Sequence, residues 1–186
     1  MVKLARDIIE AQLSGKPLPK VEGFDEKQGV FVTLETHPDH DLRGCIGFTD
    51  PVFPLKKALV QAAISAAVQD PRFPPVTLPE MDHLVVEVSV LTTPLLLQAK
   101  PEERHKKIRI GRDGLIVRWN GYCGLLLPQV PVDWKWEPKT FLSQTCIKAG
   151  IPSDYWLKPE VKIYTFQAHV FCEKTPRGPV VKHKLD

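Results

Sequence analysis

The residues best suited to chemistry lie together in the stretch Leu42-Arg43-Gly44-Cys45-Ile46-Gly47-Phe48. If this stretch is a strand, alternation places Arg43 and Cys45 on the same face, so that a guanidinium neighbours a thiol. A neighbouring cation favours the thiolate, which is the nucleophilic form of cysteine. Gly44 and Gly47 indicate a bulge or the close approach of backbone or ligand. In the alternative interpretation, Cys45 is a small buried apolar residue and Arg43 belongs to a structural ion pair.

A second group of candidate residues lies in the proline-rich segment Asp70-Pro71-Arg72-Phe73-Pro74-Pro75. Prolines restrict the backbone, so the segment is expected to run extended and to hold Asp70 and Arg72 as a fixed charge pair beside the Arg43 strand. A guanidinium there suits a carboxylate or phosphate group. The alternative is that Asp70 ends the preceding helix while Phe73 anchors the loop in the core.

Glu87 is the third candidate, in the middle of a predicted strand and on the face opposite its valines. A carboxylate here orients Arg43, accepts a proton if it is desolvated, or simply faces solvent. We therefore predict that the catalytic residues are Cys45, Arg43 and Glu87. The predicted ligand-binding residues are Gly44, Gly47, Asp70 and Arg72.

Signals for metals and common cofactors are weak. The stretch His37-Pro38-Asp39-His40-Asp41 precedes Cys45 and carries nitrogen ligands, but its composition is typical of a polar hairpin turn. The sequence has no P-loop, G-x-G-x-x-G, G-x-S-x-G or H-E-x-x-H motif. We predict neither a metal site nor a cofactor.

Two further features bear on nucleic-acid binding. The basic run over residues 104–109, followed by Arg112, indicates either phosphate contacts or a solvated strand edge guarded by cations. Trp134 and Trp136 are either stacking platforms or parts of a surface loop. The support for a nucleic-acid partner is therefore weak.

Periodicity and turn signals predict mixed helices and strands. Helices are expected over residues 2–13, 55–67 and 138–149. Strands are expected over residues 28–35, 42–48, 84–91, 108–110, 115–119, 122–127 and 161–171, with a hairpin turn at 111–114. The first two strands are typical of a hairpin, which favours an α+β fold of mainly antiparallel sheets packed with helices.

Length and composition fit a globular protein of 186 residues with 43% hydrophobic and 25% charged residues. We expect a single domain over residues 1–186, although two closely fused subdomains also fit, and a tail over 175–186 that is mobile or crosses the surface. Four separated cysteines without a C-x-x-C pair or a leader predict reduced thiols and a cytoplasmic location. No apolar run is long enough to predict a membrane span.

The motif Leu42-Arg43-Gly44-Cys45-Ile46-Gly47 resembles the signature of the AMMECR family. Other stretches resemble the family in the same order, so that the likeness covers about residues 2–171: Asp70-Pro71-Arg72-Phe73, Glu87-Val88-Ser89-Val90-Leu91, Leu126-Leu127-Pro128-Gln129-Val130 and Lys148-Ala149-Gly150. The resemblance implies an α+β fold in two closely packed subdomains, with the Arg-Gly-Cys strand lining a cleft. It also implies a functional link to Memo-type and radical-SAM proteins, and so to modification chemistry of a nucleotide or RNA.

Two hypotheses for the function follow. In the first, the chain is an enzyme or an enzyme-accessory domain whose cleft contains Arg43 and Cys45. Cys45 is then the nucleophile or an acid/base, and Arg43 activates it or binds an anion. In the second, the chain is a non-catalytic binding or adaptor module that uses the same strip to recognise a protein or a small anionic ligand.

Overall fold

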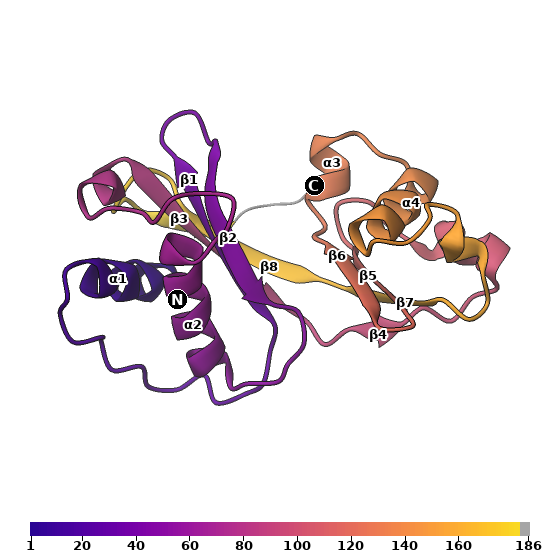
Figure 1. Ribbon diagram of the computed structural model, residues 1–186, viewed down its shortest axis with the longest axis horizontal. Helices are drawn as coiled ribbons and strands as arrows, with labels where there is room; N and C mark the ends of the chain where they lie inside the picture. Colours follow the sequence, from indigo (N-terminus) through magenta and orange to yellow (C-terminus); the bar gives the residue numbers. More distant parts are fainter. Residues whose placement is uncertain (183–186) are drawn as a thin grey trace. The chain divides into compact units, whose positions relative to one another are not determined.

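The computed structural model describes residues 1–182, and within them the chain forms two compact units. The first, here called the terminal unit, combines Met1–Leu91 with the stretch from His169 to Lys182. The second, here called the inserted unit, is the continuous segment Thr92–Ala168. Figure 1 shows the strands and helices of each unit.

The terminal unit is built on a five-stranded sheet in the order β2-β1-β3-β8-β9. These strands are β1 (Val30–Thr36), β2 (Leu42–Phe48), β3 (Leu84–Leu91), β8 (Ala168–Glu173) and β9 (Val180–Lys182). Strand β1 pairs antiparallel with both β2 and β3, and β8 pairs antiparallel with β9. The predicted β1–β2 hairpin and the predicted strand β3 are confirmed.

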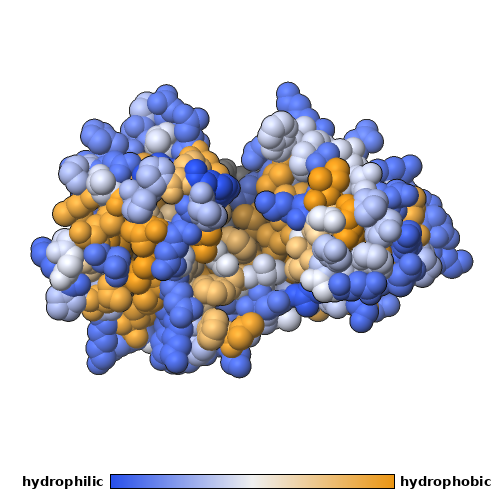
Figure 2. Space-filling view, in the orientation of Figure 1, coloured by the Kyte–Doolittle hydropathy of each residue, from blue (hydrophilic) through white to orange (hydrophobic). Residues whose placement is uncertain are grey.

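Helices α1 (Val2–Leu13) and α2 (Leu55–Val68) lie against the same sheet (Figure 1). Both helices are confirmed close to their predicted bounds. The buried stripe of α2 consists mostly of alanine, which lets its backbone approach the strands closely. Apolar side chains of both helices and of β1 and β3 form one core, which includes Ile8, Leu34, Leu59, Val86 and Val88. Figure 2 shows further apolar atoms on the surface of the helix-bearing part of this unit.

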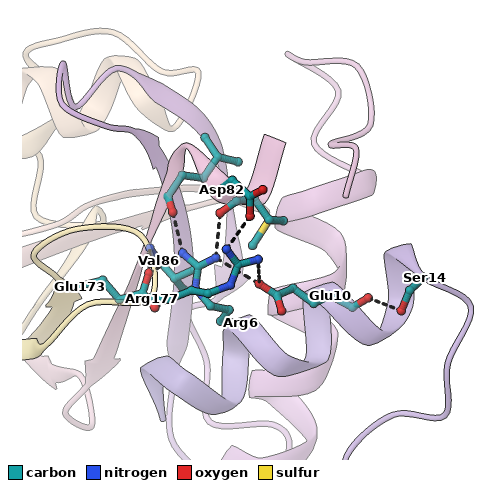
Figure 3. A network of polar contacts seen from close by, with 9 residues as sticks. Arg6, Glu10, Ser14, Asp82, Val86, Glu173 and Arg177 are labelled. Carbon is teal, nitrogen blue, oxygen red and sulfur yellow. Dashed lines mark hydrogen bonds and ion pairs between the residues drawn. The ribbon is translucent and has the colours of Figure 1, made fainter. Parts of the chain in front are cut away.

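A buried ion pair connects the first helix of the terminal unit with its late strand β8. Arg6 of α1 donates from Nε to Glu173 Oε1 at 2.7 Å and from Nη2 to Glu173 Oε2 at 2.5 Å. Both residues are almost fully buried, at 4% and 2% exposure. Glu173 also accepts from the backbone nitrogen of Val86 at 3.0 Å. Figure 3 shows this network, with the second cation Arg177 beside it.

The inserted unit contains a four-stranded sheet in the order β4-β7-β5-β6. Its strands are β4 (Leu95–Leu96), β5 (Gly114–Trp119), β6 (Tyr122–Leu126) and β7 (Lys162–Phe166), with helices α3 (Val130–Asp133) and α4 (Pro138–Lys148). Each pair of neighbouring strands in this sheet is antiparallel. The core contains Leu115, Phe141, Leu142, Cys146 and Ile163. Helix α4 is confirmed, and the α+β class is confirmed for both units.

The predicted hairpin around residues 111–114 is wrong. Residues 108–110 form no strand, and the hairpin is β5–β6 with its turn at Asn120 and Gly121. The physical reason lies in Asp113, whose carboxylate accepts from the backbone nitrogen of Arg109 at 2.9 Å and from the side chain of Arg112. These bonds close the loop on itself, so residues 108–110 are not left open for strand pairing.

The single long strand predicted over residues 161–171 is also wrong, because it is divided between two sheets. Strand β7 belongs to the inserted unit and β8 to the sheet of the terminal unit, with Gln167 between them. The backbone of Gln167 bonds to Thr92 instead of continuing a ladder. Its nitrogen donates to Thr92 Oγ1 at 2.8 Å and its carbonyl accepts from the Thr92 nitrogen at 2.8 Å.

The basic run over residues 104–109 is not a solvated strand edge. It begins inside the short 3-10 helix Pro101–Lys107, and Arg104 is buried. The Arg104 guanidinium donates to the carbonyls of Trp156, Lys158 and Val161 at 2.5–3.0 Å, so this cation is structural.

The predicted tail over residues 175–186 crosses the surface over the part that the structure describes, which is one of the two expected alternatives. Residues 175–182 cross the surface of the terminal unit, where β9 pairs with β8 and Arg177 forms ion pairs with Glu10 and Asp82. Residues 183–186 of that tail lie outside the described residues. Over residues 1–182, no helix is both long enough and apolar enough to span a membrane.

Candidate functional site

The predicted site lies on β2, and residues 42–48 of this strand are called the strip from here on. The side chains of the strip alternate between the two faces of the sheet as expected. Ile46 and Phe48 pack toward the helices of the terminal unit, and Gly44 lies against the backbone of α2. Cys45 therefore belongs to the opposite face of the sheet. It pairs with Thr33 on β1, which in turn pairs with Glu87 on β3. The sheet thus places Cys45, Thr33 and Glu87 in one row across three strands.

Arg43 lies on the same strand as Cys45, but its guanidinium is bound by the segment between α2 and β3. It donates from Nε to Glu80 Oε1 at 3.1 Å and from Nη1 to the Pro74 carbonyl at 3.0 Å. Burial acts to raise the pKa of Glu80, but bonds from Thr77 and Arg43 outweigh it and hold that pKa below its ordinary value. Arg43 is thus a partner in an ion pair, which corresponds to the alternative interpretation of its sequence position.

Asp70 and Arg72 form the charge pair that is closest to Cys45. The buried Asp70 carboxylate accepts from Arg72 Nε at 2.9 Å, from Arg72 Nη2 at 2.7 Å and from the Arg72 backbone nitrogen at 3.1 Å. Asp70 also accepts from the Cys45 backbone nitrogen at 2.9 Å, while Arg72 Nη2 donates to the Cys45 carbonyl at 3.3 Å. The bonds from Arg72, followed by those from the backbone, hold the pKa of Asp70 far below its ordinary value. The structure therefore places the predicted Asp70–Arg72 pair beside the strip, where both side chains bond to the main chain of Cys45.

The Cys45 thiol is not activated by this arrangement. Burial raises the pKa of Cys45, and the charges of Glu87 and Asp70 raise it further. The hydrogen bond from Thr33 Oγ1 to Sγ at 3.4 Å and the charge of Arg72 act in the opposite direction but do not outweigh burial. The thiol is consequently protonated at neutral pH, contrary to the thiolate expected from a neighbouring cation.

The two glycines of the strip are required by packing within the protein. A Cβ on Gly44 would lie 2.2 Å from the Ala66 carbonyl oxygen of α2. A Cβ on Gly47 would lie 2.2 Å from the Val30 carbonyl oxygen and 2.5 Å from the Phe31 ring. The close approach predicted for these positions is thus made by neighbouring protein atoms.

The sequence did not identify Thr33 and Glu80 as parts of this cluster. The β1–β2 register shifts between Leu34 and Glu35, so counting outward from the turn does not pair Thr33 with Cys45. Glu80 lies 37 positions from Arg43, in the short 3-10 helix Pro79–Asp82, whose position depends on the tertiary structure.

Among residues 1–182, no three His, Cys, Asp or Glu side chains are grouped to hold a metal ion. His40 Nδ1 instead lies 3.0 Å from Glu35 Oε2.

The raised pKa of Cys45 leads to a labelling prediction. Iodoacetamide reacts with the thiolate, so at pH 7 the exposed Cys123 should be alkylated well before Cys45. The rate at Cys45 should keep rising with pH beyond the range in which an ordinary thiol has reached its plateau. Mass spectrometry of peptides after timed labelling measures both rates, and labelling of the denatured chain provides the control. Faster labelling of Cys45 than of Cys123 at pH 7 would contradict the protonated thiol.

Comparison with known proteins agrees with this architecture. A protein-family model described as AMMECR1 matches residues 2–171. Protein MJ0810 of Methanocaldococcus jannaschii is 54% identical over 190 residues, which cover 99% of this chain and 94% of that protein. Protein PYRAB00100 of Pyrococcus abyssi is 54% identical over 193 residues, which cover 100% of this chain and 94% of that protein.

A solved structure shows the same fold. The crystal structure of the uncharacterized protein PH0010 from Pyrococcus horikoshii matches with a TM-score of 0.93 and 53% sequence identity. The match covers 98% of this chain and 94% of the other. None of these three relatives carries a name that states an activity.

Proposed function

Because this chain belongs to the AMMECR1 family, whose relatives named above carry no stated activity, we propose its function from the geometry of the strip. The proposal is a binding module that recognises a carboxylate or phosphate group, on a protein or a small molecule, through Arg72. The observation that carries it is the fixed, half-exposed guanidinium of Arg72 beside the main chain of Cys45.

The Arg72 side chain is 50% exposed, although Asp70, which holds it, is 2% exposed. Three bonds to one carboxylate fix both its backbone and its guanidinium, so little side-chain entropy remains to be lost when a ligand binds. Asp70 and Cys45 engage Nε and Nη2, which leaves Nη1 outside these contacts. A planar guanidinium in a defined orientation suits a carboxylate or phosphate oxygen.

The charges in the cluster are balanced, and this determines how an anionic ligand would be recognised. Arg43 is paired with Glu80, and Arg72 with Asp70, so the cluster has no excess of positive charge. An anionic group would therefore be recognised by hydrogen-bond geometry and not by a long-range positive field. Binding is expected to depend only weakly on salt.

Catalysis is the second candidate, and it is supported by the row formed by Cys45, Thr33 and Glu87. A protonated thiol is a proton donor, and a carboxylate on the same face is a proton acceptor. An enzyme or enzyme-accessory domain, for example in nucleotide or RNA modification, would then use Cys45 for acid/base chemistry. Nucleophilic attack by Cys45 has less support, because burial opposes the thiolate.

Replacing Arg72 tests the binding proposal. A thermal-shift screen of carboxylates, inorganic phosphate and nucleotides selects the probe, and calorimetry then measures its affinity. Arg72→Gln should weaken binding about tenfold or more, since a hydrogen bond to a charged group contributes roughly 1.5–3 kcal/mol. Cys45→Ser should leave the affinity nearly unchanged.

Arg177 provides a matched control for this test. Its side chain is 49% exposed, close to that of Arg72, and it is likewise held by carboxylates, those of Glu10 and Asp82. Arg177→Gln therefore removes a comparably exposed, ion-paired arginine and should not affect binding of the probe. If Cys45→Ser abolished binding while Arg72→Gln did not, or if a covalent adduct formed on Cys45, the enzyme hypothesis would replace this one.

A further inference from the structure

A groove on the inserted unit combines aromatic and cationic side chains. It has a volume of about 500 Å³ and is lined by Ile110, Gly111, Arg112, Pro131, Val132, Lys135 and Trp136. Beside it, Trp134 is stacked on Trp136, with ring centroids 6.1 Å apart and planes at 22°. Trp134 is 69% exposed, so a large aromatic surface faces water next to the groove.

The backbone holds this tryptophan pair in a defined geometry. Lys135, between the two tryptophans, has a φ of 53°, in the left-handed region that non-glycine residues occupy at a cost of roughly 1–2 kcal/mol. The nitrogens of Trp134 and Trp136 donate to the carbonyls of Val130 and Pro131 at 3.1 and 2.8 Å. Trp136 also packs against the core of the inserted unit. The inner ring is thus anchored, and it supports the exposed ring of Trp134.

The net positive charge of the chain lies in the unit that carries this groove. Thr92–Ala168 contains twelve Lys and Arg residues against seven Asp and Glu residues, whereas residues 1–91 and 169–182 contain twelve against fourteen. Both charged residues that line the groove, Arg112 and Lys135, are cations; Arg112 is paired with Asp113, so Lys135 contributes most of the positive charge there. An anionic occupant is therefore favoured, and an asymmetry of charge between two parts of a chain is typical of nucleic-acid binding.

We propose that this groove binds single-stranded nucleic acid, with a base stacked on the exposed face of Trp134 and the adjoining phosphates at Lys135 and Arg112. Aromatic platforms flanked by cations are the usual means of binding unpaired strands, because every base offers a flat face for stacking. A duplex is excluded from this mode, since its bases are already stacked. An anionic membrane fits less well, because Trp134 lies nearly parallel to Trp136 and offers a ring face for stacking.

Fluorescence anisotropy with a labelled uridine dodecamer and the full-length protein at low salt tests this proposal. Trp134→Ala should weaken binding by roughly 5- to 150-fold, which corresponds to about 1–3 kcal/mol for one stacked base. Trp134→Phe should keep much of the affinity, since it retains an aromatic face. Lys135→Gln should weaken binding and reduce its salt dependence by about one phosphate contact. A deoxythymidine dodecamer should behave similarly.

Matched controls separate the groove from the general charge of the unit. Leu95→Ala changes an equally exposed apolar side chain of the inserted unit, at 68% exposure, and Lys148→Gln removes an exposed cation at the end of α4. Both variants should bind the dodecamer as the wild type does. Circular dichroism checks that each variant is folded, and the high exposure of Trp134 makes a folding defect unexpected.

Three results would overturn the proposal. The first is an unchanged affinity in folded Trp134→Ala protein. The second is a loss in Lys148→Gln as large as that in Lys135→Gln, which would indicate diffuse electrostatic binding. The third is binding to phosphatidylserine-containing vesicles without binding to either single strand, which would identify a membrane surface instead.

Discussion

Replacing Arg6 by alanine is expected to lower the free energy of unfolding by about 3–5 kcal/mol, the range seen when one partner of a buried ion pair is removed. Glu173 would remain in the interior at 2% exposure, with the Val86 nitrogen as its surviving donor among the bonds described above. The carbonyls of Met81 and Leu84, which accept from Arg6 at 3.0 and 2.5 Å, would lose those bonds as well. Chemical denaturation followed by far-UV circular dichroism measures the loss.

Two controls test whether burial causes this effect. Arg177→Gln removes an arginine that is 49% exposed and also forms ion pairs, with Glu10 and Asp82, so it should cost no more than about 1 kcal/mol. Combining Arg6→Met with Glu173→Leu should recover most of the stability, because apolar side chains then replace both charges. Equal losses for Arg6→Ala and Arg177→Gln would show that burial does not set the strength of the Arg6–Glu173 pair.

Substitution of Gly44 by alanine is expected to destabilise the protein by about 3 kcal/mol, near the upper end of the cost of overpacking. The added Cβ would lie 2.2 Å from the Ala66 carbonyl oxygen. That oxygen belongs to the backbone of α2, so relief requires a shift of the helix relative to the strand. Thermal unfolding monitored by circular dichroism should show a clear drop in Tm.

Gly15→Ala is a control that separates crowding from backbone strain. Gly15 has a φ of 66°, but no atom lies within 4 Å of the position that a Cβ would occupy, whereas Gly44 has no positive φ. Gly15→Ala should therefore cost only the roughly 1–2 kcal/mol of a left-handed alanine. A Gly44→Ala protein as stable as the wild type would show that α2 can move away from β2 at little cost.

The sequence was sufficient to predict those helices and strands that are determined by the periodicity of their own side chains. The alanine stripe of α2 and the alternation of β2 each follow from side-chain periodicity against one core. The errors arose where the partner was distant in sequence. Nothing local to residues 161–171 shows that β7 and β8 join different sheets. Residues 108–110 have strand-like composition, yet the side chain of Asp113 closes their loop.

Four members of the candidate site were predictable from the sequence, but Thr33 and Glu80 were not, and neither was the pairing of the charged side chains. The sequence pointed to Arg43, Cys45, Asp70 and Arg72, and the structure places Arg72, not Arg43, against the main chain of Cys45. Proximity along a strand suggested that a cation activates the thiol. Burial decides the pKa of Cys45 in the opposite direction, and burial depends on the whole fold.

The interrupted order of the terminal unit has a consequence for synthesis on the ribosome. Arg6 emerges early, but its partner Glu173 is 167 positions later, after the entire inserted unit. Until β8 is synthesised, the N-terminal part of the terminal unit lacks the carboxylate that pairs with Arg6 and two strands of its sheet, whereas Thr92–Ala168 is continuous in sequence. Fragments that stop before β8 should consequently depend on chaperones, and adding a separate β8–β9 peptide should rescue them.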